Sequence, residues 1–216
     1  MKTRVIKVNP LDPEVRLIED AAHVLENGGV IGYPTETVYG LGADAYNEEA
    51  LERIFKIKGR ETGKPISILV ASMEMLEEIT ARIPPVAMGL IRDRWPGPLT
   101  IIFEASKSCP PTLTGDSGKI GVRISPHRIP QRLLETLKRP ITSTSANLSG
   151  MPSLSDPQEL YRVFRGKIDL VLDGGETKGG GVSTVVDVTV SPPRVVRGGV
   201  VKIKAELEVK TEEERG

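Results

Sequence analysis

Apolar side chains return every three or four positions in several segments of the chain, which is the spacing of one face of a helix. Between residues 12 and 27, for example, this spacing continues until a pair of glycines interrupts it. Similar patterns recur farther along. We expect helices over residues 12–27, 48–58, 73–82, 86–95, 130–138 and 157–164.

Shorter apolar runs, bounded by glycine, proline and serine, predict strands. These strands are mixed with the helices and do not alternate strictly with them, which favours a single α/β domain. We expect an open, twisted mixed sheet with flanking helices over residues 1–205, followed by a charged C-terminal tail over residues 206–216. The predicted strands cover residues 30–33, 66–70, 99–103, 120–124, 141–143, 170–172, 184–190 and 194–197.

Charge and cysteine content narrow the functional class. The 216 residues carry 29 basic and 29 acidic side chains, so a general nucleic-acid coat protein is excluded and any RNA contact must use a local patch. Cys109 is the single cysteine, which excludes an internal disulfide and suits a reducing compartment. The N-terminal residues lack an apolar run of signal length, and no segment has the length of a membrane span. We therefore expect a cytoplasmic protein without a membrane contact.

The first candidate site is the segment YPTETVYGLG at residues 33–42. It follows a predicted strand and contains the hydroxyl groups of Thr35 and Thr37. Its two glycines would let the backbone approach a ligand closely. An ordinary strand-to-helix connection capped by threonines explains the same residues, so the pattern alone leaves both readings open.

The second candidate contains Lys58, Arg60 and Lys64, three cations within seven residues at the end of a predicted helix. Lysine and arginine in a flexible loop suit a polyphosphate, because one gives a compact charge and the other a bidentate fork. The alternative is that these cations complement the dipole at the helix C-terminus. The segment lacks the spacing of a Walker loop or of a dinucleotide fingerprint.

The third candidate is the segment STSANLSG at residues 143–150. In an extended chain Ser143, Ser145 and Asn147 project to one face, where they could bind a carboxylate, a phosphate or a carbonyl group. A polar turn before the next helix is the alternative. Arg123 and Arg197 lie in or at the end of apolar strands, where each must find a partner or a ligand because an unpaired buried charge is costly.

Two familiar site types are not supported by the sequence. The two histidines are isolated and only one cysteine is present, so no common zinc site is predicted. The GxSxG elbow of serine hydrolases is also missing. The candidate residues are therefore hydroxyl, amide and cationic groups, which suit the binding of anions.

Taken together, the ordered segments resemble the YrdC family of L-threonylcarbamoyladenylate synthases. The resemblance covers nearly the whole chain and implies a concave, basic cavity in an open α/β fold. It also implies an ATP-dependent adenylyl (nucleotidyl) transferase, which makes threonylcarbamoyl-AMP and pyrophosphate from ATP, L-threonine and bicarbonate. The matching segments, in order, are GGVIGYPTETVYGLGADA, LERIFKIKGR, PGPLTII, GVRIS, STSANLSG and GVSTVVD.

The resemblance also implies roles for individual residues. The family's Lys-x-Arg and Ser-x-Asn tetrad falls on Lys58, Arg60, Ser145 and Asn147, which are therefore the expected catalytic residues. The threonine pocket is expected at Thr35, Thr37, Arg123, Ser143 and Ser183. Nucleotide binding is expected at Arg60, Lys64, Ser145, Asn147, Ser153 and Arg197. Mg²⁺ is expected to arrive with ATP, held by phosphates and water without a protein metal cage.

The chain departs from some relatives at the strand after the Lys-x-Arg loop, where a histidine is replaced by Leu69 or a neighbour. This departure makes threonine selectivity a separate question from adenylate formation. The implied partners are a threonylcarbamoyl transferase complex that modifies tRNA and a weak contact with tRNA itself. Two alternatives remain open at this point: a non-catalytic RNA-binding module, and a paralogue that activates a different amine or carboxylate.

Overall fold

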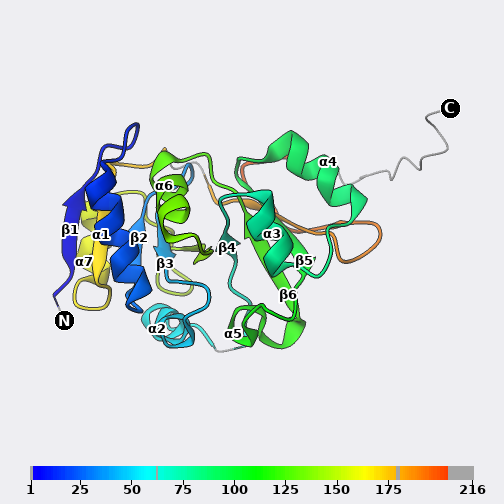
Figure 1. Cartoon of the computed structure of the whole chain (residues 1–216), viewed down its shortest axis with the longest axis horizontal. Coiled ribbons are helices and arrows are strands. Elements are labelled where there is room, and N and C mark those ends of the chain that lie inside the picture. The colour runs from blue at the N-terminus through cyan, green and yellow to red at the C-terminus, as the bar shows by residue number, and fades with distance from the viewer. Residues whose placement is uncertain (1, 62, 179–180, 204–216) are drawn as a thin grey trace.

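The computed structural model describes residues 2–61, 63–178 and 181–203. Its strands form two mixed sheets, with the five-stranded sheet at the end of the molecule that carries the N-terminus (Figure 1). Within this sheet β1, β9 and β2 run parallel, whereas β3 is antiparallel to both of its neighbours. The strand order is β1 (Arg4–Lys7), β9 (Leu170–Asp173), β2 (Ile31–Tyr33), β3 (Gly40–Gly42) and β8 (Thr144–Ser145).

The second sheet has six strands and also mixes directions. The pairs β10–β5 and β4–β6 are parallel, and the other three pairs are antiparallel. The expectation of a single α/β domain with mixed pairing is therefore confirmed, although the strands divide into two sheets. The order is β11 (Arg194–Arg197), β10 (Thr184–Asp187), β5 (Leu99–Glu104), β6 (Lys119–Arg123), β4 (Ile68–Leu69) and β7 (Ile141–Thr142).

The helices cover these sheets. α1 and α6 pack against each other, and their apolar faces form one core cluster with β2 and β9. A larger cluster joins α2, α3, α4 and α7 to β3, β4, β5, β6 and β10, and Figure 1 shows α3 and α4 beside the six-stranded sheet. The helices are α1 (Val15–Glu26), α2 (Glu48–Lys58), α3 (Met73–Ile79), α4 (Pro85–Arg94), α5 (Pro111–Thr114), α6 (Arg128–Leu137) and α7 (Pro157–Phe164), with a 3₁₀ turn at Gly115–Ser117.

The chain passes from one sheet to the other at Ser143. The predicted strand over residues 141–143 is in fact two short strands, because β7 pairs with β4 in one sheet and β8 pairs with β3 in the other. The Thr142 N–H donates to the Ala43 carbonyl oxygen at 2.9 Å, and the Ala43 N–H donates to the Thr142 hydroxyl at 3.0 Å, so these bonds join the sheets just before the crossing. Polar groups on both sides of Ser143 are therefore placed between the two sheets.

The two glycines of β3 have a structural function that the sequence did not indicate. Gly40 lines a polar cavity, so a close approach of the backbone to a ligand stays a prediction, and the ring of Tyr33 packs against both glycines. A Cβ atom at Gly40 or at Gly42 would lie 2.9 Å from a ring carbon of Tyr33. The hydroxyl group of Tyr33 then donates a hydrogen bond to the Thr142 carbonyl oxygen at 2.9 Å. Glycine at these two positions therefore lets a buried aromatic ring cross the strand.

Two further expectations concern the ends of the chain. The first helix begins at Val15 and not at residue 12, with Glu14 as its N-cap. The predicted tail over residues 206–216 lies outside the described residues. Among the residues described, no helix combines the length and the apolar character needed to cross a membrane.

Candidate functional site

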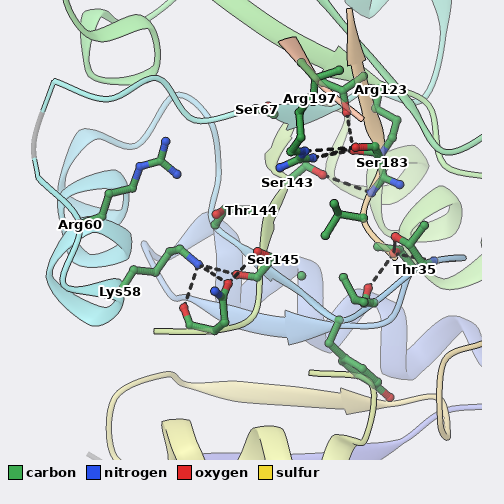
Figure 2. A pocket seen from close by; sticks show the side chains of 18 of the residues that line it. Thr35, Lys58, Arg60, Ser67, Arg123, Ser143, Thr144, Ser145, Ser183 and Arg197 are labelled. Atoms are coloured by element: carbon green, nitrogen blue, oxygen red, sulfur yellow. Dashed lines mark hydrogen bonds between the residues drawn. The ribbon is translucent and has the colours of Figure 1, made fainter. Parts of the chain in front are cut away.

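A polar cavity of about 390 Å³ is lined by residues of both sheets (Figure 2). This volume lies within the range of small-molecule sites, roughly 300–1,000 Å³. Hydroxyl groups and cations dominate the wall, and no acidic side chain of the described residues contributes to it. The predicted residues in the wall are Thr35, Thr37, Lys58, Arg60, Lys64, Arg123, Ser143, Ser145, Asn147, Ser183 and Arg197.

Lys58 ends α2 and turns inward because Gly59 takes up the left-handed conformation, with a φ of 60°. Its ammonium group donates to the Ser145 carbonyl oxygen at 2.5 Å, the Asn147 carbonyl oxygen at 2.9 Å and the Asn147 Oδ1 at 3.0 Å. An ammonium group has three hydrogens, so this buried lysine uses all of them on the segment 145–147. Lys58 therefore fixes that segment of the wall.

The side chain of Asn147 is also fully engaged. Its Oδ1 accepts a second hydrogen bond from the Ser145 hydroxyl at 2.7 Å. Its Nδ2 donates to the carbonyl oxygens of Leu148 at 3.0 Å and Met151 at 2.7 Å. Three of the four predicted tetrad residues thus form one hydrogen-bond network, which pre-organises this part of the wall.

Arg60, the fourth tetrad residue, is not part of this network. Its Nη2 donates to the Pro65 carbonyl oxygen at 2.9 Å, and Figure 2 shows its guanidinium group apart from the Lys58 cluster. Its Nε is buried and has no hydrogen-bond partner among the described residues. Lys64 also reaches the wall, but its ammonium group pairs with Glu61 at 2.9 Å. Among the described residues, the loop therefore contains one buried donor without a partner, the Nε of Arg60.

Burial, and after it the repulsion between neighbouring cations, lowers the pKa values of cations in the cavity wall. Burial, followed by the positive charge of Arg60, lowers the pKa of Lys58 to about 8. Burial also lowers the pKa of Arg60. Burial and then the charges of Arg123 and Arg60 lower the pKa of Arg197. All three cations would be stabilised by an anion in the cavity.

The opposite end of the cavity is built around Arg123, at the end of β6. Its Nη2 lies 3.4 Å from the Ser143 hydroxyl, and its buried Nε has no partner in the described part of the chain. Arg197 donates to the Ser183 carbonyl oxygen at 3.0 Å and to the Ser183 hydroxyl at 3.1 Å. Figure 2 shows Arg123, Ser143, Ser183 and Arg197 together, away from Lys58 and Arg60.

Two predicted positions behave differently from the rest. Ser153 is not in the cavity wall, so its expected contact with the nucleotide depends on the resemblance alone. Leu69 is fully buried in the core cluster of α1 and α6, and Ser67 lines the cavity two residues earlier. The structure places the other predicted residues around one space, while their individual roles stay predictions.

Two further wall residues, Ser67 and Thr100, did not stand out in the sequence as candidates. Thr100 is buried, and its hydroxyl lies 2.9 Å from that of Ser183. The segment PGPLTII contained this residue, but its position inside an apolar strand gave no sign that its hydroxyl faces a cavity. Ser67 lies just before a two-residue strand, so its orientation was equally hard to infer.

The described residues contain no cluster of three or more histidine, cysteine, aspartate or glutamate side chains that could hold a metal ion. The wall instead offers hydroxyl and amide groups together with cations. This set of groups does not fit a divalent cation bound by the protein alone. It fits an anion.

Comparison with known proteins assigns this chain to a family. A family model described as Telomere recombination, Sua5_yciO_yrdC, matches residues 23–199. The threonylcarbamoyl-AMP synthase of Pyrococcus abyssi is 43% identical over 182 residues, which cover 84% of this chain and 54% of the relative. This chain therefore spans about half the length of that protein.

Two solved structures agree with the fold. Pyrococcus abyssi Sua5 complexed with L-threonine matches 91% of this chain and 58% of its own with a TM-score of 0.88 and 42% identity. Escherichia coli YciO matches 94% of this chain and 98% of its own with a TM-score of 0.87 and 33% identity. The chain belongs to the Sua5/YciO/YrdC family.

Proposed function

We propose that this protein condenses ATP, L-threonine and bicarbonate into threonylcarbamoyl-AMP and pyrophosphate, as an ATP-dependent adenylyl transferase. The observation that carries the proposal is a cavity wall of hydroxyl groups and cations, with Arg60 at one end and Arg123 at the other. Each guanidinium group has a buried Nε without a partner among the described residues, which is costly, so an anion beside either side chain would be stabilising. The reaction needs two anionic groups, a triphosphate and an amino-acid carboxylate, in one enclosed space.

Each end of the cavity suits one of these groups. Arg60 and Lys64 would hold the phosphates, because their loop carries the excess positive charge. Arg123 and Ser143 would hold the carboxylate of threonine, and Ser183 would support them. This division leaves the carbamate of the amino acid between the two ends, where it can attack the α-phosphate. Holding both anions together would supply proximity and stabilise the charge that develops on phosphorus.

Mg²⁺ would accompany ATP, since the part of the wall that the structure describes has no acidic ligand for a metal. Oxygens of the phosphates and of water would coordinate it, and it would offset part of the negative charge of the triphosphate. The residues of the chain would contribute the cations around the phosphates and the hydroxyl groups around the amino acid.

The names of relatives support the same reaction. A protein named threonylcarbamoyl-AMP synthase shares 43% identity with this chain, and the related Sua5 structure contains L-threonine. The product would pass to a threonylcarbamoyl transferase complex that modifies tRNA, with at most a weak tRNA contact here. A reaction that uses ATP and supplies tRNA modification belongs in the cytoplasm.

The test is release of pyrophosphate with ATP, Mg²⁺ and bicarbonate, in the presence of L-threonine, of L-serine or of no amino acid. The proposal expects release that requires both threonine and bicarbonate, together with threonylcarbamoyl-AMP detected by mass spectrometry. Silence with every amino acid, from a folded protein that binds tRNA in a salt-sensitive manner, would favour the RNA-binding module.

A second candidate is a paralogue with a different substrate. The observation that favours it is Leu69, which is buried in the core, because relatives with a histidine at or beside this position would differ from this chain at the threonine end of the cavity. Release of pyrophosphate that requires bicarbonate and prefers another amino acid would identify this case.

A further inference from the structure

Glu36 forms an ion pair with Arg123, whose side chain is buried. It lies between Thr35 and Thr37, which both line the cavity, but its own side chain is not part of the wall. Its Oε1 pairs with Nη1 of Arg123, and the two side chains are 16% and 6% exposed. A buried charge that loses its partner is strongly destabilised, so each group depends on the other to stay inside.

The pair determines which donors of Arg123 remain available. A guanidinium group is a rigid plane with five hydrogens, so fixing Nη1 limits how the plane can rotate. The Nη2 group has only the long contact of 3.4 Å to Ser143, and Nε has no partner among the residues described. Glu36 therefore occupies one end of the plane and leaves the other donors free.

The second oxygen of Glu36 fixes the carboxylate itself. It accepts a hydrogen bond from the Ser125 hydroxyl at 2.5 Å, and that hydroxyl in turn accepts from the His127 backbone at 3.2 Å. His127 caps α6, because its Nδ1 accepts from the Ile129 backbone at 3.2 Å. Ser125, in the turn after β6, therefore fixes the Glu36 carboxylate, and Glu36 in turn fixes the side chain of Arg123 at the end of β6.

We propose that Glu36 is a positioning residue for the carboxylate of the amino-acid substrate, acting through the orientation of the Arg123 guanidinium. This inference rests on the proposed function, because it takes an α-amino acid as the ligand of Arg123. The reach of the Glu36 side chain, and not its charge alone, sets the direction of the free donors. A change in that reach should therefore weaken binding of the amino acid and leave binding of ATP unchanged.

Two conservative variants separate reach from charge. Glu36→Asp keeps the negative charge beside Arg123 but shortens the side chain by one methylene. Glu36→Gln keeps the length and one acceptor oxygen for Nη1 but removes the charge. The dissociation constants of L-threonine and of ATP would be measured by calorimetry for each variant, and thermal melting would establish that each is folded.

We expect Glu36→Asp to weaken threonine binding at least fivefold, with ATP binding within twofold of wild type. Glu36→Gln should melt at a lower temperature, because the buried Arg123 loses its counter-ion, while its affinity for both ligands stays within threefold of wild type. Ser125→Ala is the intermediate case, since it removes the other contact of the same carboxylate and leaves the Arg123 pair. It should lower the melting temperature and weaken threonine affinity less than Glu36→Asp does, with ATP binding within twofold of wild type.

Several results would overturn the inference. Wild-type threonine affinity in Glu36→Asp, or an equal loss of threonine and ATP binding, would show that Glu36 is only structural. A loss in Glu36→Gln as large as that in Glu36→Asp would show that charge, and not reach, is what counts. If the wild type binds L-serine but not L-threonine, the proposed function fails while the same comparison proceeds with serine. A wild type that binds neither amino acid overturns both.

Discussion

The ammonium group of Lys58 lies 3.0 Å from Oδ1 of Asn147, and its other two hydrogens bond the carbonyl oxygens of Ser145 and Asn147. A phosphate could bond this nitrogen only by displacing one of those acceptors. Lys58 therefore acts mainly by holding the segment 145–147 and by contributing a buried positive charge. Arg60, whose guanidinium group lines the cavity and does not bond the segment 145–147, is better placed to contact the nucleotide directly.

This difference predicts distinct effects for two substitutions. Lys58→Met and Arg60→Ala should each slow pyrophosphate release at least tenfold, about 1.4 kcal/mol of barrier. Lys58→Met should also lower the free energy of unfolding by about 1–3 kcal/mol, because buried acceptors lose their donor. Arg60→Ala should leave the unfolding free energy close to wild type. Steady-state kinetics and urea titrations check both, and near-normal turnover in either variant would remove that residue from the mechanism.

Binding of ATP should be coupled to proton uptake. In the free protein burial and Arg60 lower the pKa of Lys58 to about 8, so at pH 8.5 most of the molecules carry a neutral Lys58. Phosphate anions nearby favour the charged form and raise this pKa, so the lysine takes up a proton when ATP binds. Calorimetry in two buffers with different ionisation enthalpies measures the uptake.

The proton uptake by Lys58 on ATP binding should be positive at pH 8.5. It should be close to zero at pH 6.5, where Lys58 is already charged in the free and in the ATP-bound protein. The variant Lys58→Met supplies the control for protonation of the nucleotide itself. Proton release at pH 8.5, or an uptake that persists unchanged in Lys58→Met, would contradict the assignment to this residue.

The loop that carries Arg60 and Lys64 should depend on Gly115. A Cβ atom at Gly115 would lie 1.9 Å from the Gly63 carbonyl oxygen, and the φ of Gly115 is 53°. Gly115→Ala therefore has to displace the loop, and we expect the KM for ATP to rise at least fivefold. Gly118 also has a positive φ, of 62°, but a Cβ there meets no atom within 4 Å.

Gly118→Ala is therefore the matched control for backbone strain. It should cost about 1 kcal/mol of stability, as expected for a non-glycine residue in this region, and leave the KM for ATP unchanged. Equal KM values in the two variants would show that the contact with Gly63 does not position the loop.

The sequence predicted the longer elements and the polar segments better than their arrangement. Amphipathic spacing predicted α2, α6 and α7 close to their observed bounds, because each of these helices buries one apolar face. It missed β3 and β8, since strands of two or three residues, one of them rich in glycine, have no usable period. The division into two sheets was missed for the same reason, as the crossing at Ser143 lies between such strands.

The candidate site shows a similar contrast. Lys58, Arg60, Ser145 and Asn147 stood out as polar groups in glycine-rich or turn-like segments, and all four line one cavity. Their division of labour did not follow from residue type, because the saturation of Lys58 by backbone oxygens depends on the tertiary fold. The ion pair of Glu36 and Arg123 joins residues far apart in the sequence, and the residues around each of them did not indicate its partner.

The contact between Tyr33 and the crossing strand predicts a loss of stability. Burial raises the pKa of the Tyr33 hydroxyl, so this group stays protonated and donates to the Thr142 carbonyl oxygen at 2.9 Å. Tyr33→Phe should therefore reduce the free energy of unfolding by about 1–3 kcal/mol, because a buried carbonyl loses its donor.

Tyr46→Phe is the matched control, since Tyr46 is 36% exposed and water can satisfy its hydroxyl group. This variant should unfold within about 0.5 kcal/mol of wild type, as usual for a surface substitution. Urea titrations followed by circular dichroism would measure both variants. The same midpoint for Tyr33→Phe and wild type would mean that the bond across the two sheets adds nothing to stability. A larger loss than the stated range would instead mean that the crossing at Ser143 rearranges when this hydroxyl is removed.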